Sequence, residues 1–307
     1  MPNWDSVLRE ISAEQARARE SAHDIIRRRY LKRLNRHTGR NVIAYYSGYL
    51  SKRIEGTEIN DEDKNGFMLC VHEMDRSKGL DLILHTPGGD GQAAVSLVDY
   101  LRGMFGDNMR AIVPQLAMSA GTMLACSCKS IIMGKQSSLG PVDPQFGMIG
   151  AANLLSEVRR AYDEILANPN ASFFWNPILS KITPSFIERC ELAVADSNEF
   201  IERTLRTNML STLGKAEQDE IIGKIVEIFA NNEGKAHNTH IQAEKCKEVG
   251  LIIEDLEEDQ ALQDLVLTIH HCYMHTLMNT PAFKIIENHR GKALVRQQIV
   301  PMQLVPG

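Results

Sequence analysis

The chain has 307 residues, 43% of them hydrophobic and 24% charged, a composition typical of a globular protein with a full core. Its formal net charge is -5 and its pI is near 6.1, so overall charge gives no reason to expect nucleic acid or an anionic membrane as a partner. No run approaches the roughly 20 apolar residues of a membrane helix, and the first ten residues lack the apolar core of a signal peptide. These features predict a cytoplasmic protein whose scattered cysteines stay reduced.

The first segment is predicted to be a basic helix. Residues 5–37 are rich in charge, with Ile26, Tyr30 and Leu34 on one helical face, and between Ile25 and Arg40 there are seven Arg or Lys and no acid. Such a helix can contact acidic lipid or nucleic acid, but a helix packed on the protein body or on a second subunit has the same pattern. We therefore treat residues 1–40 as a basic N-terminal helix and expect neither nucleic acid nor membrane as a partner.

From Asn41 onward, strands alternate with helices. Strands are predicted from Asn41 and at 81–86, 109–114 and 130–134, and helices at 61–76, 92–105 and 120–128. This alternation predicts an α/β fold with parallel strand pairing. Past Gly150 the sequence is mainly helical, apart from a short strand at 251–253. We expect one catalytic domain over residues 41–255 and a C-terminal helical extension over 256–307.

Two loops stand out, Thr86–Gly91 and Gln115–Gly121, because each follows an apolar strand and opens a helix. Open α/β sheets bind their ligands at such positions. The paired glycines of the first loop allow a sharp turn, and its Gly89 N–H can face the same point as the Ser119 hydroxyl and the Ala120 N–H of the second. That arrangement would be a nucleophile beside an oxyanion hole. Serine is also a common helix N-cap, so Ser119 taken alone does not identify a site.

Several separated motifs carry a family resemblance. LILHTPGGD, followed further along by AMSAGTMLACSCKSIIMGKQSSLGPVDPQF, resembles the Clp protease proteolytic subunit and the signal peptide peptidase A group. SLGPVDPQF and HCYMHTLMNTPAFKIIENHRG resemble the serine dehydrogenase proteinase family more closely still. The resemblance implies a Clp protease/crotonase-like spiral of β-β-α units and a serine peptidase that needs no cofactor. It also implies that Ser119 is the nucleophile, with oxyanion amides from Gly89 and Ala120.

The resemblance further implies a peptide or protein substrate and a homo-oligomer, either of trimeric symmetry or a multiple of it, or a tetramer. The apolar helix around Leu265 to Leu277 offers a contact face between subunits.

The resemblance does not supply the general base. Clp-type enzymes use a His and then an Asp, and the signal peptidase type uses a Lys. The segment 137–143 occupies the place of the Clp His but contains no His. A base must reach Ser119 and be unprotonated when it acts. The candidates are Asp143 as the nearest titratable residue, lysines whose pKa burial would have to lower, and two histidines: Asp143, Lys135, Lys181, His237 and His240.

Other interpretations remain open. Gly89, Gly91 and Ala94 match a dinucleotide-binding fingerprint, but the next strand does not end in the acidic residue that would hold a ribose. A crotonase-like acyl-CoA enzyme shares the oxyanion-hole architecture without a serine nucleophile. A non-catalytic or partner-activated binding module would keep the fold and need no base of its own.

A histidine cluster near the C-terminus suggests a metal site. His271 and His275 share one face of a predicted helix, beside His270 and Cys272. The zincin pattern requires a Glu directly after the first His, and Cys272 stands there. We therefore expect this helix to be packed in the core or at a subunit contact, with no bound metal.

Overall fold

The chain is built around a mixed β-sheet. A computed structural model describes residues 4–15, 21–147, 149–230 and 238–298. The central sheet of these residues consists of β1 (Asn41–Ser47), β2 (Leu80–His85), β3 (Met109–Val113), β5 (Ser130–Met133), β10 (Ile253–Asp255), β11 (Ala282–Asn288) and β12 (Ala293–Gln297). The strand order is β10-β5-β3-β2-β1-β11-β12. The strands from β10 to β1 are parallel, whereas β11 is antiparallel to both of its neighbours. The α/β fold and the parallel pairing expected from the sequence are confirmed.

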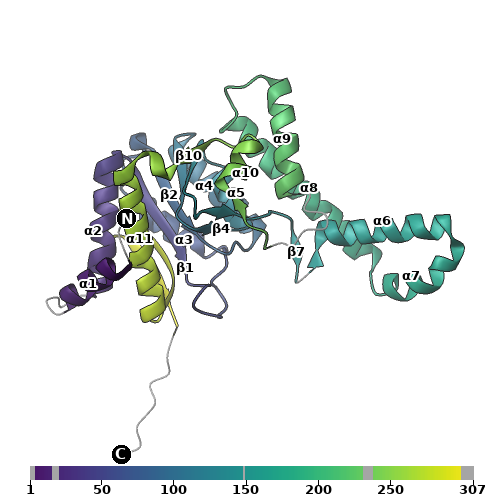
Figure 1. The fold of residues 1–307 in the computed structure, drawn as a ribbon, viewed down its shortest axis with the longest axis horizontal. Helices are drawn as coiled ribbons and strands as arrows, with labels where there is room; N and C mark the ends of the chain where they lie inside the picture. The colour runs from purple at the N-terminus through teal and green to yellow at the C-terminus, as the bar shows by residue number, and fades with distance from the viewer. Residues whose placement is uncertain (1–3, 16–20, 148, 231–237, 299–307) are drawn as a thin grey trace, which may run out of the picture.

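Helices cover both faces of this sheet (Figure 1). On one face lie α2 (Ala22–Thr38) and α11 (Gln260–Asn279), and on the other α3 (Asp63–Val71), α4 (Gly91–Phe105) and α5 (Ala120–Cys126). Successive β1 residues point to opposite faces, so Ile43 and Tyr45 pack toward α3 while Val42 and Tyr46 pack toward α11. Burial on both faces explains why these strands read as continuous apolar runs.

Most of the remaining helices and strands lie between β5 and β10 in the sequence. α6 and α7 project away from the sheet, and α8 runs back toward it (Figure 1). These elements are α6 (Ala151–Ala167), α7 (Ser172–Leu179), α8 (Pro184–Thr207), α9 (Lys215–Phe229), α10 (Ala243–Glu248), β4 (Leu116–Ala117), β6 (Ser138–Leu139), β7 (Gln145–Phe146), β8 (Ile149–Gly150) and β9 (Ile241–Gln242), with short 3-10 turns at 76–78, 169–171 and 256–258. None of the helices that the structure describes is both long enough and apolar enough to cross a membrane.

The N-terminal segment forms two helices, not the single helix expected over 5–37. α1 (Trp4–Gln15) packs against α2, where the Tyr30 hydroxyl donates to Glu10 over 2.9 Å. Twenty residues of continuous helix would place these side chains roughly 30 Å apart. Three basic residues of α2 pair with acidic side chains of the fold: Arg27 and Arg28 with Glu287, each at 2.9 Å, and Arg29 with Glu14. This supports packing on the protein body as the reason for the basic pattern.

The C-terminal part is helical only as far as Asn279. After α11, the hairpin β11–β12 completes the sheet, with β11 paired to β1, so residues 282–297 differ from the expected helical extension. The strand was hidden in the sequence because β11 buries polar residues, among them Lys284, Glu287 and Asn288. Their presence breaks the apolar pattern by which a buried strand is usually recognised.

Helix α11 is packed inside the chain. Val266, Ile269 and Leu277 are buried against α2 and the sheet, so the expectation that this helix supplies a subunit contact face is wrong. The large apolar side chains that are most exposed lie instead on α6, α7 and α8: Tyr162, Leu166, Phe173, Phe174 and Leu192.

The C-terminal histidines serve the packing of α1. The His275 ring lies 3.8 Å from the Trp4 ring, centroid to centroid, and its Nε2 lies 3.2 Å from the Trp4 carbonyl oxygen. Among the described residues, no group of three or more His, Cys, Asp or Glu is arranged to hold a metal ion. All six cysteines are buried and free, as the sequence predicts.

A histidine buried against α11 is expected to make the protein sensitive to acid. His85 is fully buried, and within the described residues neither ring nitrogen has a hydrogen-bond partner. Burial lowers the pKa of His85 to about 3. Between pH 6.5 and 3 the unfolded chain therefore binds a proton at this position that the folded chain does not, and stability falls as the pH falls.

We predict that His85→Phe loses less stability on acidification than the wild-type protein, by up to about 2 kcal/mol between pH 6.5 and 5. Urea unfolding at the two pH values measures this difference. His72→Phe, at an exposed histidine, is the control and should change nothing. Equal losses in His85→Phe and wild type would show that His85 is not the acid-sensitive group.

Candidate active site

Two strand-to-helix turns meet at the carboxyl end of the sheet. The first connects β2 to α4, and the second leads from β3 through β4 to α5. They are joined by backbone hydrogen bonds from Thr86 N–H to Leu116 O and from Met118 N–H to Thr86 O, each 3.1 Å long. The sequence-predicted loops are thus side by side, because β2 and β3 are adjacent parallel strands.

Ser119 has a strained backbone at the start of α5. Its φ is 49° and its ψ is -117°, a positive φ that non-glycine residues seldom adopt. An N-cap serine has an extended backbone and a hydroxyl that accepts a hydrogen bond from the first turn of the helix, and Ser119 has neither. Its side chain lines a cavity instead. Strain of this kind, which costs about 1–3 kcal/mol, is concentrated at functional sites.

The Pro87-Gly88-Gly89 turn lies directly against Ser119. A Cβ on Gly88 would stand 2.6 Å from the Ser119 Cβ and 3.1 Å from the Ala120 nitrogen, so a side chain there would displace the second turn. Gly88 and Gly89 also have φ values of 93° and 148°, which L side chains rarely adopt. Both glycines are therefore required by geometry, and they leave the backbone around Ser119 open to a ligand.

The geometry leaves two N–H groups beside Ser119. Ala120 begins α5, so its N–H has no acceptor within the helix. Gly89 lies in a short parallel pairing with Ile59, in which Ile59 N–H donates to Gly88 O over 2.7 Å and Asp90 N–H donates to Ile59 O over 2.9 Å. Successive residues of a paired strand point their N–H groups to opposite sides. The Gly89 N–H therefore points away from Ile59.

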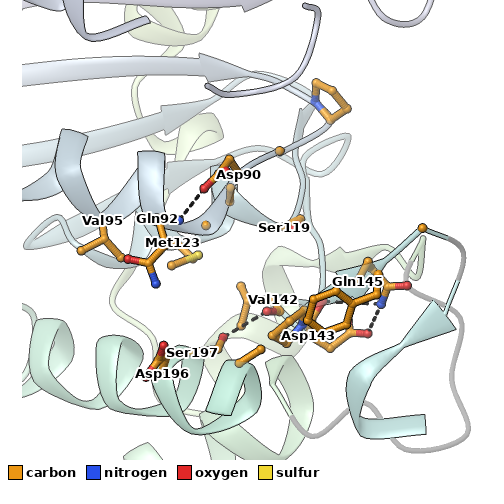
Figure 2. Close-up of a pocket in the computed structure, with 18 residues that line it drawn as sticks. Asp90, Gln92, Val95, Ser119, Met123, Val142, Asp143, Gln145, Asp196 and Ser197 are labelled. Carbon is orange, nitrogen blue, oxygen red and sulfur yellow. Dashed lines mark hydrogen bonds between the residues drawn. The ribbon is translucent and has the colours of Figure 1, made fainter. Parts of the chain in front are cut away.

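Ser119, Gly89 and Ala120 line one cavity of about 550 Å³. Figure 2 shows Asp196 and Ser197 of α8 across this cavity from Asp90, Gln92 and Met123. Its apolar lining comes from Val95, Met123, Val142, Phe146 and Ala193. A cavity of this size lies within the range of about 300–1,000 Å³ that is usual for ligand sites.

Asp143 shares the cavity with Ser119. β6 is parallel to β4, which brings the segment after β6 next to the turn that holds Ser119. The Thr122 hydroxyl fixes this contact, lying 2.8 Å from Ala117 O and accepting from Gly140 N–H at 3.0 Å. The Asp143 side chain is 2% exposed, and Gln145 Nε2 donates to its Oδ2 over 2.5 Å.

The other candidate bases are not brought to Ser119 within the described chain. Lys135 is exposed and lines a separate depression beside Glu257, and Lys181 is exposed between α7 and α8. His240 is exposed before β9 and does not line the Ser119 cavity. His237 lies outside the described residues. Among those that the structure describes, the charged side chains lining this cavity are Asp90, Asp143 and Asp196.

Asp90 has a structural role that the sequence analysis did not assign. Its Oδ1 accepts from Gln92 N–H at 2.7 Å and from Ala93 N–H at 3.0 Å, so it caps the N-terminus of α4. The α8 residues Ala193, Asp196 and Ser197 were also missed. No local motif marks them, because they enter the site only through the return of a long amphipathic helix.

The chain is similar to known proteins. A sequence profile described as ClpP-like SDH-type serine proteinase matches residues 13–287. The chain belongs to this family. Two curated relatives, both from Methanocaldococcus jannaschii, are named only as uncharacterized proteins. MJ0137 is 30% identical over 202 residues, covering 64% of this chain and 60% of its own length, and MJ1495 is 25% identical over 233 residues, covering 73% and 70%. This chain thus spans less than two thirds of MJ0137.

We predict that Gly89→Val lowers the reactivity of Ser119 at least about 100-fold, because a side chain there displaces the amide that the sequence predicts as an oxyanion donor. Stability should fall as well, by about 2 kcal/mol, since the Cβ would stand 2.4 Å from the Ile59 backbone and the residue would have a positive φ. Reaction with a fluorophosphonate, measured per folded molecule, gives the first value, and urea unfolding gives the second.

The control is Gly103→Ala, in α4, where an added Cβ meets nothing within 4 Å. It should label like the wild-type protein. Wild-type labelling in a folded Gly89→Val protein would contradict the placement of the Gly89 amide at the reacting carbonyl.

Proposed function

We propose that this member of the ClpP-like SDH-type serine proteinase family cleaves peptide bonds through an acyl-enzyme on Ser119. The Ser119 oxygen attacks the carbonyl carbon, and its proton passes through a base to the departing amine as the C–N bond breaks. Water then hydrolyses the ester and restores the serine. The Gly89 and Ala120 N–H groups donate to the carbonyl oxygen while it carries negative charge.

The observation that carries this proposal is the backbone of Ser119. A serine with a φ of 49°, no capping hydrogen bond and a place in a cavity beside two available N–H groups has the features of a nucleophile on a strand-to-helix turn. An ordinary N-cap would have no reason to retain the strain.

We propose that the β-β-α spiral of Clp proteases describes the arrangement around this site. In support, β3 of the large sheet is followed by β4 of a small three-stranded sheet and then by α5, and β5 is followed by β6 of the same small sheet.

The homo-oligomer and the cytoplasmic location likewise stay predictions. The exposed apolar side chains of α6, α7 and α8 are a better candidate for a contact between subunits than α11.

For the base, we propose Asp143 over Lys135 and Lys181. Asp143 shares the cavity with Ser119 and is oriented by Gln145, whereas both lysines are exposed and would have to come from a second copy of the chain. A carboxylate can take a proton from a positioned hydroxyl if geometry brings them together.

A partner-activated module is the second candidate. It is favoured by one observation, that neither Lys nor His lines the cavity among the described residues. In that case the cavity would bind a peptide and react only when another chain supplies the base.

We predict that a fluorophosphonate probe forms its covalent adduct on Ser119, located by peptide mapping, and that Ser119→Ala abolishes the adduct. The matched control is Ser197→Ala, which removes a hydroxyl that lines the same cavity but donates to Val142 O at 3.1 Å. This variant should still be labelled. An adduct that persists in Ser119→Ala would refute the proposed nucleophile.

We predict that Asp143→Asn slows labelling of Ser119 by about 100-fold or more, which is the usual effect of losing a general base. Asp196→Asn removes another cavity-lining carboxylate and should label at the wild-type rate. Time courses of fluorophosphonate labelling, followed by stopped flow or on gels, compare Asp143→Asn and Asp196→Asn with the wild-type protein. Undiminished labelling in Asp143→Asn would exclude Asp143 as the base.

A further inference from the structure

A buried ion pair lies behind the glycine turn. Lys284 of β11 and Asp63 of α3 are both fully buried, and the Lys284 ammonium lies 2.8 Å and 3.0 Å from the two Asp63 carboxylate oxygens. Burial lowers the pKa of Lys284, and the adjacent Asp63 carboxylate opposes this shift. Replacing such a pair by apolar residues is often neutral or stabilising, so its stability contribution alone does not explain it.

Hydrogen bonds connect this pair to the Ile59 segment, and we call this connection the first arm. The Lys284 ammonium also donates to the Glu58 carbonyl oxygen over 2.6 Å, and Asp63 Oδ2 accepts from Asn60 N–H at 3.1 Å. Both residues that flank Ile59 are therefore fixed by the ion pair. Ile59 in turn pairs with the backbone of Gly88 and Asp90, which fixes the direction of the Gly89 N–H between them.

A second connection, the second arm, leads through side chains to the Pro87-Gly88-Gly89 turn. The Tyr45 hydroxyl donates to Asp63 Oδ2 over 2.8 Å, and the Thr86 side chain lies near this hydroxyl. Thr86 Oγ1 accepts from Gly88 N–H at 3.1 Å. Both arms thus start at Asp63 and end on the residues next to Gly89.

We propose that Lys284, Asp63 and Tyr45 are positioning residues whose task is to aim the Gly89 N–H at the reacting carbonyl. This inference rests on the proposed function of the site. None of the three lines the Ser119 cavity. They act through the Glu58–Asn60 segment and Thr86, and they hold a turn whose glycines have little conformational restriction of their own. Precise aim matters, since a displacement of about 1 Å at an active site can lower its rate about 100-fold.

The test uses the double variant Lys284→Met with Asp63→Leu, which removes both charges and leaves an apolar pair in their place. We expect this variant to remain folded with reduced stability, because the Tyr45 hydroxyl and the Asn60 N–H lose their acceptor and the Glu58 carbonyl loses its donor. Per folded molecule, it should label at Ser119 about 10- to 100-fold more slowly. The loss should be in the maximal labelling rate at saturating probe, while the probe concentration for half-maximal rate changes little. Tyr45→Phe, which breaks the second arm alone, should show a smaller loss of the same kind.

The matched control is Arg27→Met, which breaks an equally buried ion pair, with Glu287, on the opposite face of the sheet. It should lower stability but leave the labelling rate per folded molecule unchanged. A wild-type rate in the double variant, or an equal loss in Arg27→Met, would overturn the positioning role.

Amide hydrogen exchange tests the inference separately from the proposed function. In the double variant, the Gly88 and Asp90 amides should exchange faster than in wild type, and in Arg27→Met they should not. If the wild-type protein does not label at Ser119, then the proposed function fails, while exchange still decides whether the ion pair holds the turn. Unchanged exchange in the double variant would refute the inference whatever the labelling result.

Discussion

The close contact between two backbone turns governs the rest of this structure. Gly88 approaches the Ser119 Cβ and the Ala120 nitrogen so closely that no side chain fits between them. This contact requires glycine on one side and a strained serine on the other. It also requires adjacent parallel strands, because only these deliver both turns to the same edge of the sheet.

Much of the surrounding architecture can be understood as support for that contact. β4 and β6 bring the Gly140–Asp143 segment against the Ser119 turn, and the Thr122 hydroxyl joins the two. On the other side, Ile59 pairs with the glycine turn. The strained φ of Ser119 persists because bonds on several sides determine its position. The site is therefore a property of the whole domain, although its most recognisable residues come from two short loops.

The sequence was informative where local chemistry determines structure. Two Gly-rich or Ser-containing loops after apolar strands correctly predicted that Gly89, Ser119 and Ala120 would meet, since parallel strands and turn residues leave few alternatives. The neighbourhood of Asp143 was also predicted, from its place in the segment 137–143 that follows Ser119. The two lysines were predicted wrongly as cavity residues. Lys135 follows an apolar strand, which suggested burial, and Lys181 could have folded back from the helical half, but both are exposed and neither lines the Ser119 cavity. β11 was missed because Lys284 and Glu287 are buried only through partners distant in sequence.

The sequence separation within the buried ion pair has a consequence for biosynthesis. Lys284 follows Asp63 by 221 residues and also follows Ser119 along the chain. A chain still on the ribosome holds Ser119 and the glycine turn long before it holds the lysine that pairs with Asp63 behind them. The Ile59 segment, and with it the glycine turn, therefore gains this support only when β11 has paired with β1.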